Sequence, residues 1–179
     1  MGPRAEQERV VTRFESSVLP HIDPAYNLAR WLTRNGHDAE DLVQESLLRA
    51  FQAFHGFRGA DGRAWLLAIV RNVCYTWLHR NRQQDLTTEF DEEIHTLEGD
   101  VLNPEKLILR EGDSARVQQA LEELPVEFRE MLVLREIEGL SYKEISTVVD
   151  IPIGTVMSRL ARARGRLQRA LTARPGEER

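Results

Sequence analysis

Apolar residues recur every three or four positions along most of this 179-residue chain, which is the period of an α-helix and not of a β-strand. Eight segments show the pattern, and we predict a helix over each of them: residues 6–19, 23–34, 38–55, 63–82, 104–123, 125–138, 141–149 and 154–172. The stretches between them contain turn formers, such as the three glycines of residues 56–63. The pattern therefore predicts an all-α protein.

Two turns in the first half carry a more specific signal. Asp23 followed by Pro24 is typical of an N-cap with proline at the first helical position, so we expect the second helix to begin there. Asn35 and Gly36 both tolerate the left-handed backbone, so we expect this pair to end that helix.

A polar segment over residues 85–103 separates two groups of helices and shows neither helical nor strand spacing. We interpret it as a linker. Asn103-Pro104 repeats the cap-and-proline signal and opens the second group. We therefore expect two small helical domains, residues 1–84 and 104–173, joined by an acidic linker and followed by a polar tail over residues 174–179.

The charge of the chain is unevenly distributed. The formal net charge of −5 argues at first against a nucleic-acid ligand. However, residues 85–103 hold seven acids and no Lys or Arg, so the rest of the chain is net positive. Between Thr155 and Arg174 there are six arginines and no acid. The distribution therefore favours a negatively charged partner that binds the C-terminal end of this chain.

The chain lacks the sequence signals of membrane, secreted and catalytic proteins. No apolar run approaches the roughly 20 residues that span a bilayer, and the first residues form no apolar signal segment. The single cysteine, Cys74, cannot form an internal disulfide. No phosphate-binding loop, HExxH motif or Cys–His cluster is present. We therefore expect a cytoplasmic protein that does not insert into membranes, binds no metal or cofactor, and is not an enzyme.

The strongest motif is the run YKEISTVVDIPIGTVMSRLA at residues 142–161, which has the layout of a DNA-binding helix-turn-helix. Asp150 stands at the turn, where a left-handed residue is expected, and Pro152 prevents the first helix from continuing. The inner faces of the two helices are apolar: Ile145, Val148, Val149, Val156, Leu160, Ala163 and Leu167.

The outer face of the second of these helices is cationic. Its residues are three or four positions apart and so share one face: Ser158, Arg159, Arg162, Arg166 and Arg169. Arginine pairs with guanine in the major groove or binds phosphate. The alternative is an αα-hairpin with solvated arginines. A solvated face normally mixes both signs of charge, so we favour DNA binding.

Three long motifs together resemble the extracytoplasmic-function sigma factors of bacterial RNA polymerase, which contain regions 2 and 4 of the sigma-70 family. They are DAEDLVQESLLRAF (38–51), FRGADGRAWLLAIVRNVCYTWLHRNR (57–82) and LPVEFREMLVLREIEGLSYKEISTVVDIPIGTVMSRLARAR (124–164). The resemblance implies a sigma factor that binds core RNA polymerase and promoter DNA. It also implies control by an anti-sigma factor.

The resemblance assigns roles to particular residues. It places the contact with the β′ clamp helices of core polymerase at Glu40, Asp41, Leu42, Gln44 and Glu45. It places recognition and melting of the −10 promoter element at Phe57, Arg58, Arg63, Trp65, Arg71, Asn72, Tyr75, His79 and Arg80. It places −35 recognition at Thr155, Ser158, Arg159, Arg162 and Arg166, and contact with the β flap on the helix 128–138, with Leu132, Arg135 and Glu136 as candidates.

The alternative class is a stand-alone helix-turn-helix repressor or activator. Such proteins usually dimerise on two half-sites about 34 Å apart. The sequence offers no obvious dimerisation helix, and the first domain has another use if the resemblance holds. We therefore favour the sigma factor.

Overall fold

The computed structural model describes residues 2–82 and 111–172. The expected linker, the expected helix start at Asn103-Pro104 and the expected polar tail lie outside these residues. Within the described ranges all regular elements are helical, which confirms the all-α prediction. None of the helices in these ranges is long and apolar enough to cross a membrane.

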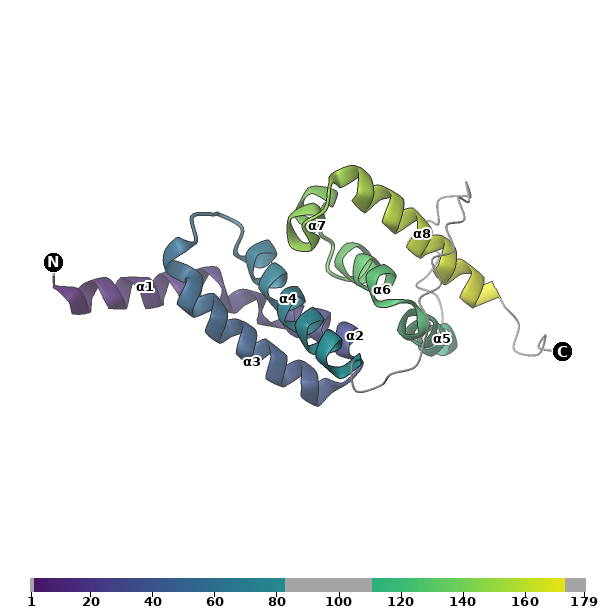
Figure 1. Ribbon diagram of the computed structural model, residues 1–179, viewed down its shortest axis with the longest axis horizontal. Coiled ribbons are helices and arrows are strands. Elements are labelled where there is room, and N and C mark those ends of the chain that lie inside the picture. The colour runs from purple at the N-terminus through teal and green to yellow at the C-terminus, as the bar shows by residue number, and fades with distance from the viewer. Residues whose placement is uncertain (1, 83–110, 173–179) are drawn as a thin grey trace.

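The N-terminal unit, residues 2–82, consists of α1 (Pro3–Ser17), α2 (Ile22–Thr33), α3 (Gly36–Ala53) and α4 (Gly62–Arg82). Helices α2, α3 and α4 pack on one another, while α1 projects away from them toward the N-terminus (Figure 1). Leu28, Leu32 and Leu66 are fully buried between these helices, because the apolar stripe of each helix faces the other two.

The C-terminal unit, residues 111–172, consists of α5 (Glu111–Glu123), α6 (Val126–Leu132), a π-helical turn (Val133–Ile137), α7 (Tyr142–Val149) and α8 (Ile153–Thr172). Helix α6 packs against α8 and, in the other unit, α2; Met131 of α6 and Leu134 of the π-helical turn are fully buried. The expected single helix over 125–138 is thus an α-helix followed by one wider turn.

The turns at both ends of α2 differ from the expectation. A 3₁₀ turn (Leu19–His21) leads directly into α2, so the N-cap position belongs to His21 and Asp23 lies in the first helical turn. At the other end, Arg34 takes the left-handed conformation, with φ of 60°. Asn35 is extended, and its side chain caps α3 by accepting hydrogen bonds from the N–H groups of His37 and Asp38. The N-capping strength of asparagine therefore outweighs its tolerance of the left-handed region.

The helix-turn-helix forms as predicted. Asp150 is left-handed with φ of 57°, between α7 and α8. A capping box starts α7: the Ser141 hydroxyl accepts from the Glu144 N–H, and the Glu144 carboxylate accepts from the Ser141 N–H at 2.7 Å. The inner-face residues expected on α7 and α8 are all buried.

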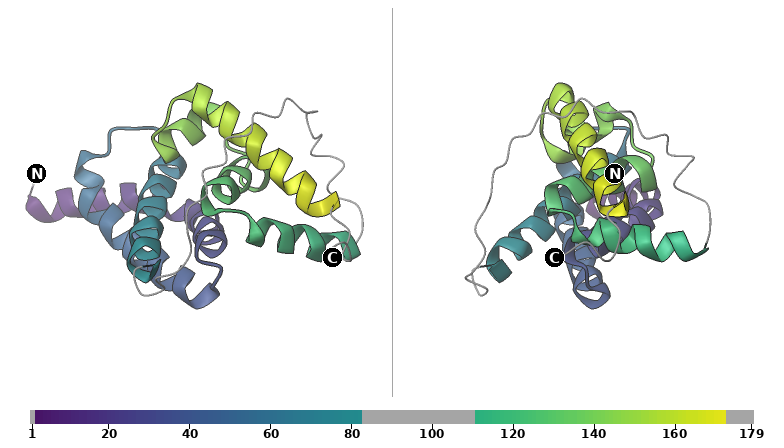
Figure 2. Two further views of the ribbon diagram at one scale, coloured as in Figure 1. Left: turned by 45° about the vertical axis from the view of Figure 1, so that its right-hand side comes forward. Right: turned by 90° about the vertical axis from the view of Figure 1, so that its right-hand side faces the viewer.

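The two units pack against each other, which the sequence does not indicate. Helix α4 lies along α7, and α2 lies along α6. The left view of Figure 2 shows the start of α4 beside α7. One face of α4 is therefore covered by the C-terminal unit.

Candidate nucleic-acid interface

The outer face of α8 presents cations to solvent. Arg162 is exposed, and its Nε donates to the Ser158 carbonyl oxygen one turn earlier at 3.5 Å. Arg159 and Arg166 are half-buried, and the Arg166 guanidinium lies 4.8 Å from the centre of the Phe128 ring. Thr155 is also half-buried, near the N-terminus of the helix. Arg162 is thus the most accessible of the arginines expected to read the −35 element.

A groove of about 530 Å³ runs between α8 and the junction of α5 with α6. Leu124, Pro125 and Phe128 form its apolar wall, and Arg162 and Arg166 lie on its α8 side. Of the residues expected at the β flap, Leu132 is buried. The Arg135 guanidinium covers the Tyr142 ring, and Glu136 pairs with Arg164 inside the C-terminal unit.

The loop between α3 and α4 holds its phenylalanine inside the protein. The Phe57 ring is 6% exposed and packs on Phe54, with ring centres 5.5 Å apart, and on Trp65, with ring centres 4.7 Å apart. Arg13 of α1 donates to the Phe57 carbonyl oxygen at 3.0 Å. In this conformation the loop therefore offers the exposed side chain of Arg58 to a ligand, and the expected base-stacking surface of Phe57 is not accessible.

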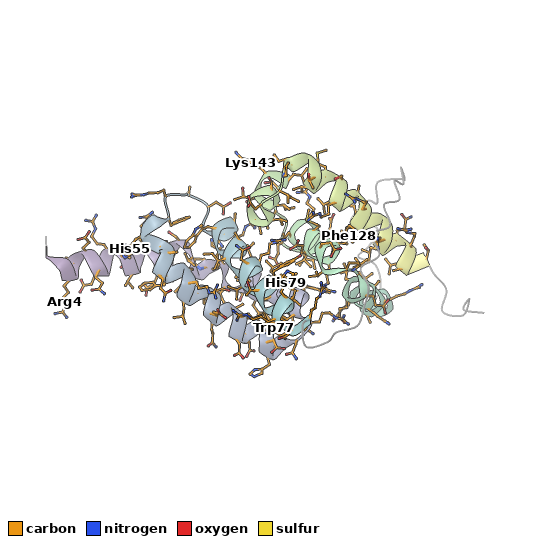
Figure 3. The ribbon with its side chains drawn as sticks, viewed as in Figure 1. Arg4, His55, Trp77, His79, Phe128 and Lys143 are labelled. Atoms are coloured by element: carbon orange, nitrogen blue, oxygen red, sulfur yellow. The ribbon has the colours of Figure 1, made fainter. Side chains whose placement is uncertain are left out.

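A pocket of about 600 Å³ lies between this loop and the C-terminal unit. Phe57, Arg58 and Trp65 line it from one side, and Lys143 and Glu144 of α7 line it from the other. Figure 3 shows Lys143 on α7. His79 lies near the C-terminal end of α4, whereas the pocket borders the N-terminal end of that helix. Trp65 is half-buried and borders the pocket.

The other residues expected at the −10 element fall into two groups on α4. Asn72, His79 and Arg80 are exposed. Arg63, Arg71 and Tyr75 lie under the C-terminal unit and are half-buried.

The covered group makes close polar contacts with acids of the C-terminal unit. Arg71 donates through Nε and one terminal nitrogen to both carboxylate oxygens of Glu130, at 2.8 and 3.0 Å. Its guanidinium also lies 4.2 Å from the centre of the Tyr75 ring. Burial raises the pKa of Glu130, which the Arg71 guanidinium opposes, and burial also raises the pKa of Tyr75. Arg63 donates to the Glu144 carboxylate at 3.1 Å and to the Glu138 carbonyl oxygen at 3.3 Å.

The face of α3 expected to bind polymerase is largely exposed. Glu40, Asp41, Gln44 and Glu45 are accessible, and Glu45 pairs with Arg49 one turn later. Leu42 is 6% exposed and belongs to the core, so its side chain is not part of that surface.

Two apolar residues on α3 were missed as surface candidates. Leu48 is 66% exposed and continues the face that Gln44 and Glu45 begin, because it follows them at helical spacing. Phe51 is 42% exposed and has its ring edge against Phe14. The signal available in the sequence was the position of Leu48 four residues after Gln44.

The buried acid Glu130 was also missed. Its side chain is fully buried although it follows Arg129 directly and precedes the apolar run 131–134. An acid next to such a run is the available signal, since an acid is almost never fully buried unless it is paired.

No metal-binding cluster is found among the described residues. These residues contain no cluster of His, Cys, Asp and Glu side chains that could hold a metal ion. Cys74 is fully buried in α4.

Comparison with known proteins places both units in one family. The family described as Sigma-70 region 2 matches residues 18–84, and Sigma-70, region 4 matches residues 114–167. The RNA polymerase sigma-H factor of Pseudomonas aeruginosa is 36% identical over 166 residues, covering 88% of this chain and 86% of that relative. The ECF RNA polymerase sigma factor SigE of Mycolicibacterium smegmatis is 35% identical over 167 residues, covering 92% of this chain and 63% of that relative. The chain thus spans less than two thirds of SigE.

A solved structure has a similar arrangement. The sigma factor RpoE of Bartonella quintana, in complex with the anti-sigma factor NepR, gives a TM-score of 0.68 at 28% identity, covering 90% of this chain and 98% of that one. Because both family matches, the related sequences and this fold agree, the chain belongs to the sigma-70 family, among the extracytoplasmic-function sigma factors of RNA polymerase.

Proposed function

We propose that this sigma factor binds core RNA polymerase through α3 and reads promoter DNA with both units, α4 at the −10 element and α8 at the −35 element. The observation that carries the proposal is the exposed cationic face of α8 on a complete helix-turn-helix. A major groove admits one helix, and arginine binds its guanines and the flanking phosphates.

The −35 contact depends most on Arg162. Its side chain is exposed and makes no ion pair among the described residues. Arg159 and Arg166 flank it at helical spacing, and Thr155 and Ser158 lie closer to the N-terminus of the helix. Arg164 is a poor candidate, since it is tied to Glu136 by two hydrogen bonds.

The −10 contact uses the loop after α3 and the outer face of α4. Arg58, Asn72, His79 and Arg80 are accessible in this conformation. Aromatic and cationic side chains in alternation suit melted DNA, because bases stack and phosphates pair. Arg63, Arg71, Tyr75 and Phe57 require a change in packing before they can contact DNA.

The polymerase contact uses Glu40, Asp41, Gln44 and Glu45, with Leu48 as an apolar anchor. A large exposed apolar side chain beside acids suits a protein interface that is electrostatically selective and partly desolvated. The partner surfaces are the β′ clamp helices for α3 and the β flap for the C-terminal unit.

Region 2 then corresponds to residues 1–84 and region 4 to residues 104–173, with residues 85–103 as an acidic connector in the cytoplasmic holoenzyme. An anti-sigma factor is a further partner. The structure of RpoE with NepR supports this, since that fold resembles the present one across both units.

Run-off transcription with purified core polymerase tests the proposal. Transcript is expected only when core and this chain are both present. Tight binding to a palindrome without core, and no initiation, would instead support a stand-alone repressor or activator. Arg162→Ala should weaken −35-dependent initiation and keep core binding in a pull-down, whereas the control Arg4→Ala, on the remote helix α1, should change neither (Figure 3).

A further inference from the structure

Several charged and polar groups pair across the contact between the two units, beside the apolar side chains of the shared core. Beside the pairs of Arg71 with Glu130 and Arg63 with Glu144, Asn27 donates to the Glu138 carboxylate at 3.1 Å. Arg129 donates to the Leu32 carbonyl oxygen at 3.5 Å. Each of these bonds joins α2 or α4 to the C-terminal unit.

The pair of Arg71 with Glu130 is the most enclosed of them. The Glu130 side chain is fully buried and the Arg71 side chain is 16% exposed. The two parallel hydrogen bonds have the fork geometry that arginine uses equally for carboxylate and for phosphate. While Glu130 occupies both donors, the Arg71 fork is not available to a DNA phosphate.

Arg63 also donates hydrogen bonds to the C-terminal unit. Glu144 of α7 and the end of the π-helical turn at Glu138 accept from its two terminal nitrogens. Thus two arginines assigned to the −10 element face carboxylates of the unit assigned to the −35 element.

From these contacts we propose that the C-terminal unit acts as an internal DNA mimic: Glu130 and Glu144 take the positions of −10 phosphates and mask Arg71 and Arg63 until the units separate. The proposal rests on the proposed function, because it needs α4 to contact DNA. It adds a state in which the chain covers its own promoter-binding surface with its own residues.

The chemistry of the contact makes separation feasible. A buried ion pair gains little net free energy, because desolvation of both charges offsets their attraction. Arg129 is 4% exposed and bonds only backbone oxygens within the described ranges, and its buried Nε has no hydrogen-bond partner there. Burial lowers the pKa of Arg129 to about 10, because a desolvated site disfavours the charged guanidinium. Opening lets water reach these charged groups, and their rehydration offsets part of the contacts that are lost.

The test compares two glutamates that each accept two hydrogen bonds from one arginine, Glu130 across the units and Glu136 within the C-terminal unit. The Glu130 side chain is fully buried, whereas that of Glu136 is 25% exposed. Glu130→Gln removes a charge that pairs across the two units. Glu136→Gln removes a charge that pairs with Arg164 inside the C-terminal unit, also through two hydrogen bonds. Both variants remove one negative charge from the chain, so any general effect of net charge on the affinity for DNA is the same in both. Glu144→Gln is a second test variant, since glutamine keeps the capping box.

Opening is measured by pulsed electron resonance between spin labels at exposed positions 52 on α3 and 168 on α8 of the full chain. The buried Cys74 needs no replacement. DNA binding is measured by the anisotropy of a fluorescein-labelled, random-sequence 20-nucleotide single strand at low salt.

We expect Glu130→Gln to add a longer-distance population and to bind the strand about tenfold more tightly than Glu136→Gln. We also expect its salt dependence to steepen by about 0.7 logarithmic units for each arginine released. If the spin-label distances are unchanged in both Glu130→Gln and Glu144→Gln, and circular dichroism shows normal helix content, the proposed masking of Arg71 and Arg63 is wrong. Opening without a gain in affinity over Glu136→Gln would overturn it as well. Failure of the proposed function is separate, since it shows as absent run-off transcription in every variant.

Discussion

Gly62 is a position where the backbone of α4 passes very close to the end of α1. It is buried at the first residue of α4, and a Cβ atom there would lie 1.9 Å from the Ser17 carbonyl oxygen and 3.0 Å from its carbonyl carbon. Ordinary contact begins near 3.4 Å, so Gly62→Ala requires a shift of about 1.5 Å between the two segments. The obstacle is backbone at the end of a helix and cannot rotate away.

The expected cost follows from two opposing terms. Overpacking of a well-filled site costs about 1–3 kcal/mol, and a backbone clash belongs at the upper end of that range. Replacing glycine by alanine also lowers the conformational entropy of the unfolded chain, which stabilises the folded state by about 0.4–1 kcal/mol. We therefore expect Gly62→Ala to lower the free energy of unfolding by about 2 kcal/mol. With a urea m value of about 1–3 kcal/mol/M, the midpoint falls by about 1 M.

Urea unfolding followed by circular dichroism at 222 nm measures this change. The matched control is Gly165→Ala in the middle of α8, where an added Cβ meets nothing within 4 Å. Because alanine is the better helix former, this variant should gain about 0.5–1 kcal/mol. A midpoint for Gly62→Ala at or above that of the parent protein would refute the clash.

Four further tests address smaller features. Arg34→Gly should raise stability by about 1 kcal/mol in thermal unfolding, since it relieves the left-handed backbone at φ of 60°; a loss of stability would contradict this. Ser141→Ala should cost about 1 kcal/mol at pH 7 through loss of the α7 cap. The Ser141 N–H is the main cause of the lowered pKa of Glu144, so the stability that this carboxylate provides is complete above its ordinary pKa of 4.5 and is lost as the pH falls through the lowered value. The advantage of the parent over Glu144→Gln should therefore shrink in acid, and a constant difference would exclude the mechanism. Finally, burial raises the pKa of Cys74 to about 12, so the thiol should resist a disulfide reagent in the folded protein and react fully in concentrated guanidinium. Rapid reaction of the folded chain would place the thiol at the surface.

The features that were predictable from sequence have local causes. The helix-turn-helix depends on Asp150 at the turn and on apolar spacing within some 20 residues, and both are visible in the sequence. The ends of α2 were harder, since Asn35 is suited both to a left-handed turn and to an N-cap, and only the competition between them decides. The buried state of Phe57 depends on Phe54 and Trp65 from two different elements, so no local pattern reveals it.

The contact between the units had no local signal at all. Arg71 and Glu130 are 59 positions apart, and each alone resembles a solvated charge on an amphipathic helix. Helix propensity and hydrophobic periodicity depend on residues that are close along the chain, so neither can predict a pair such as Arg71 and Glu130. For the same reason the sequence assigns Arg63 and Arg71 to DNA without any indication that carboxylates of the same chain already pair with them.

The π-helical turn at Val133–Ile137 is a position where a single-residue deletion could alter the structure of this protein during evolution. Its wider backbone ring, closed by the Glu138 N–H on the Val133 carbonyl oxygen, contains one residue more than an α-helical turn. Loss of a single codon within it would restore a regular helix. Every residue beyond it would then rotate by about 100° and move by about 1.5 Å relative to α6. Loss of three nucleotides is thus enough to reorient α8 against the rest of the molecule, without any change in the residues of α8 itself.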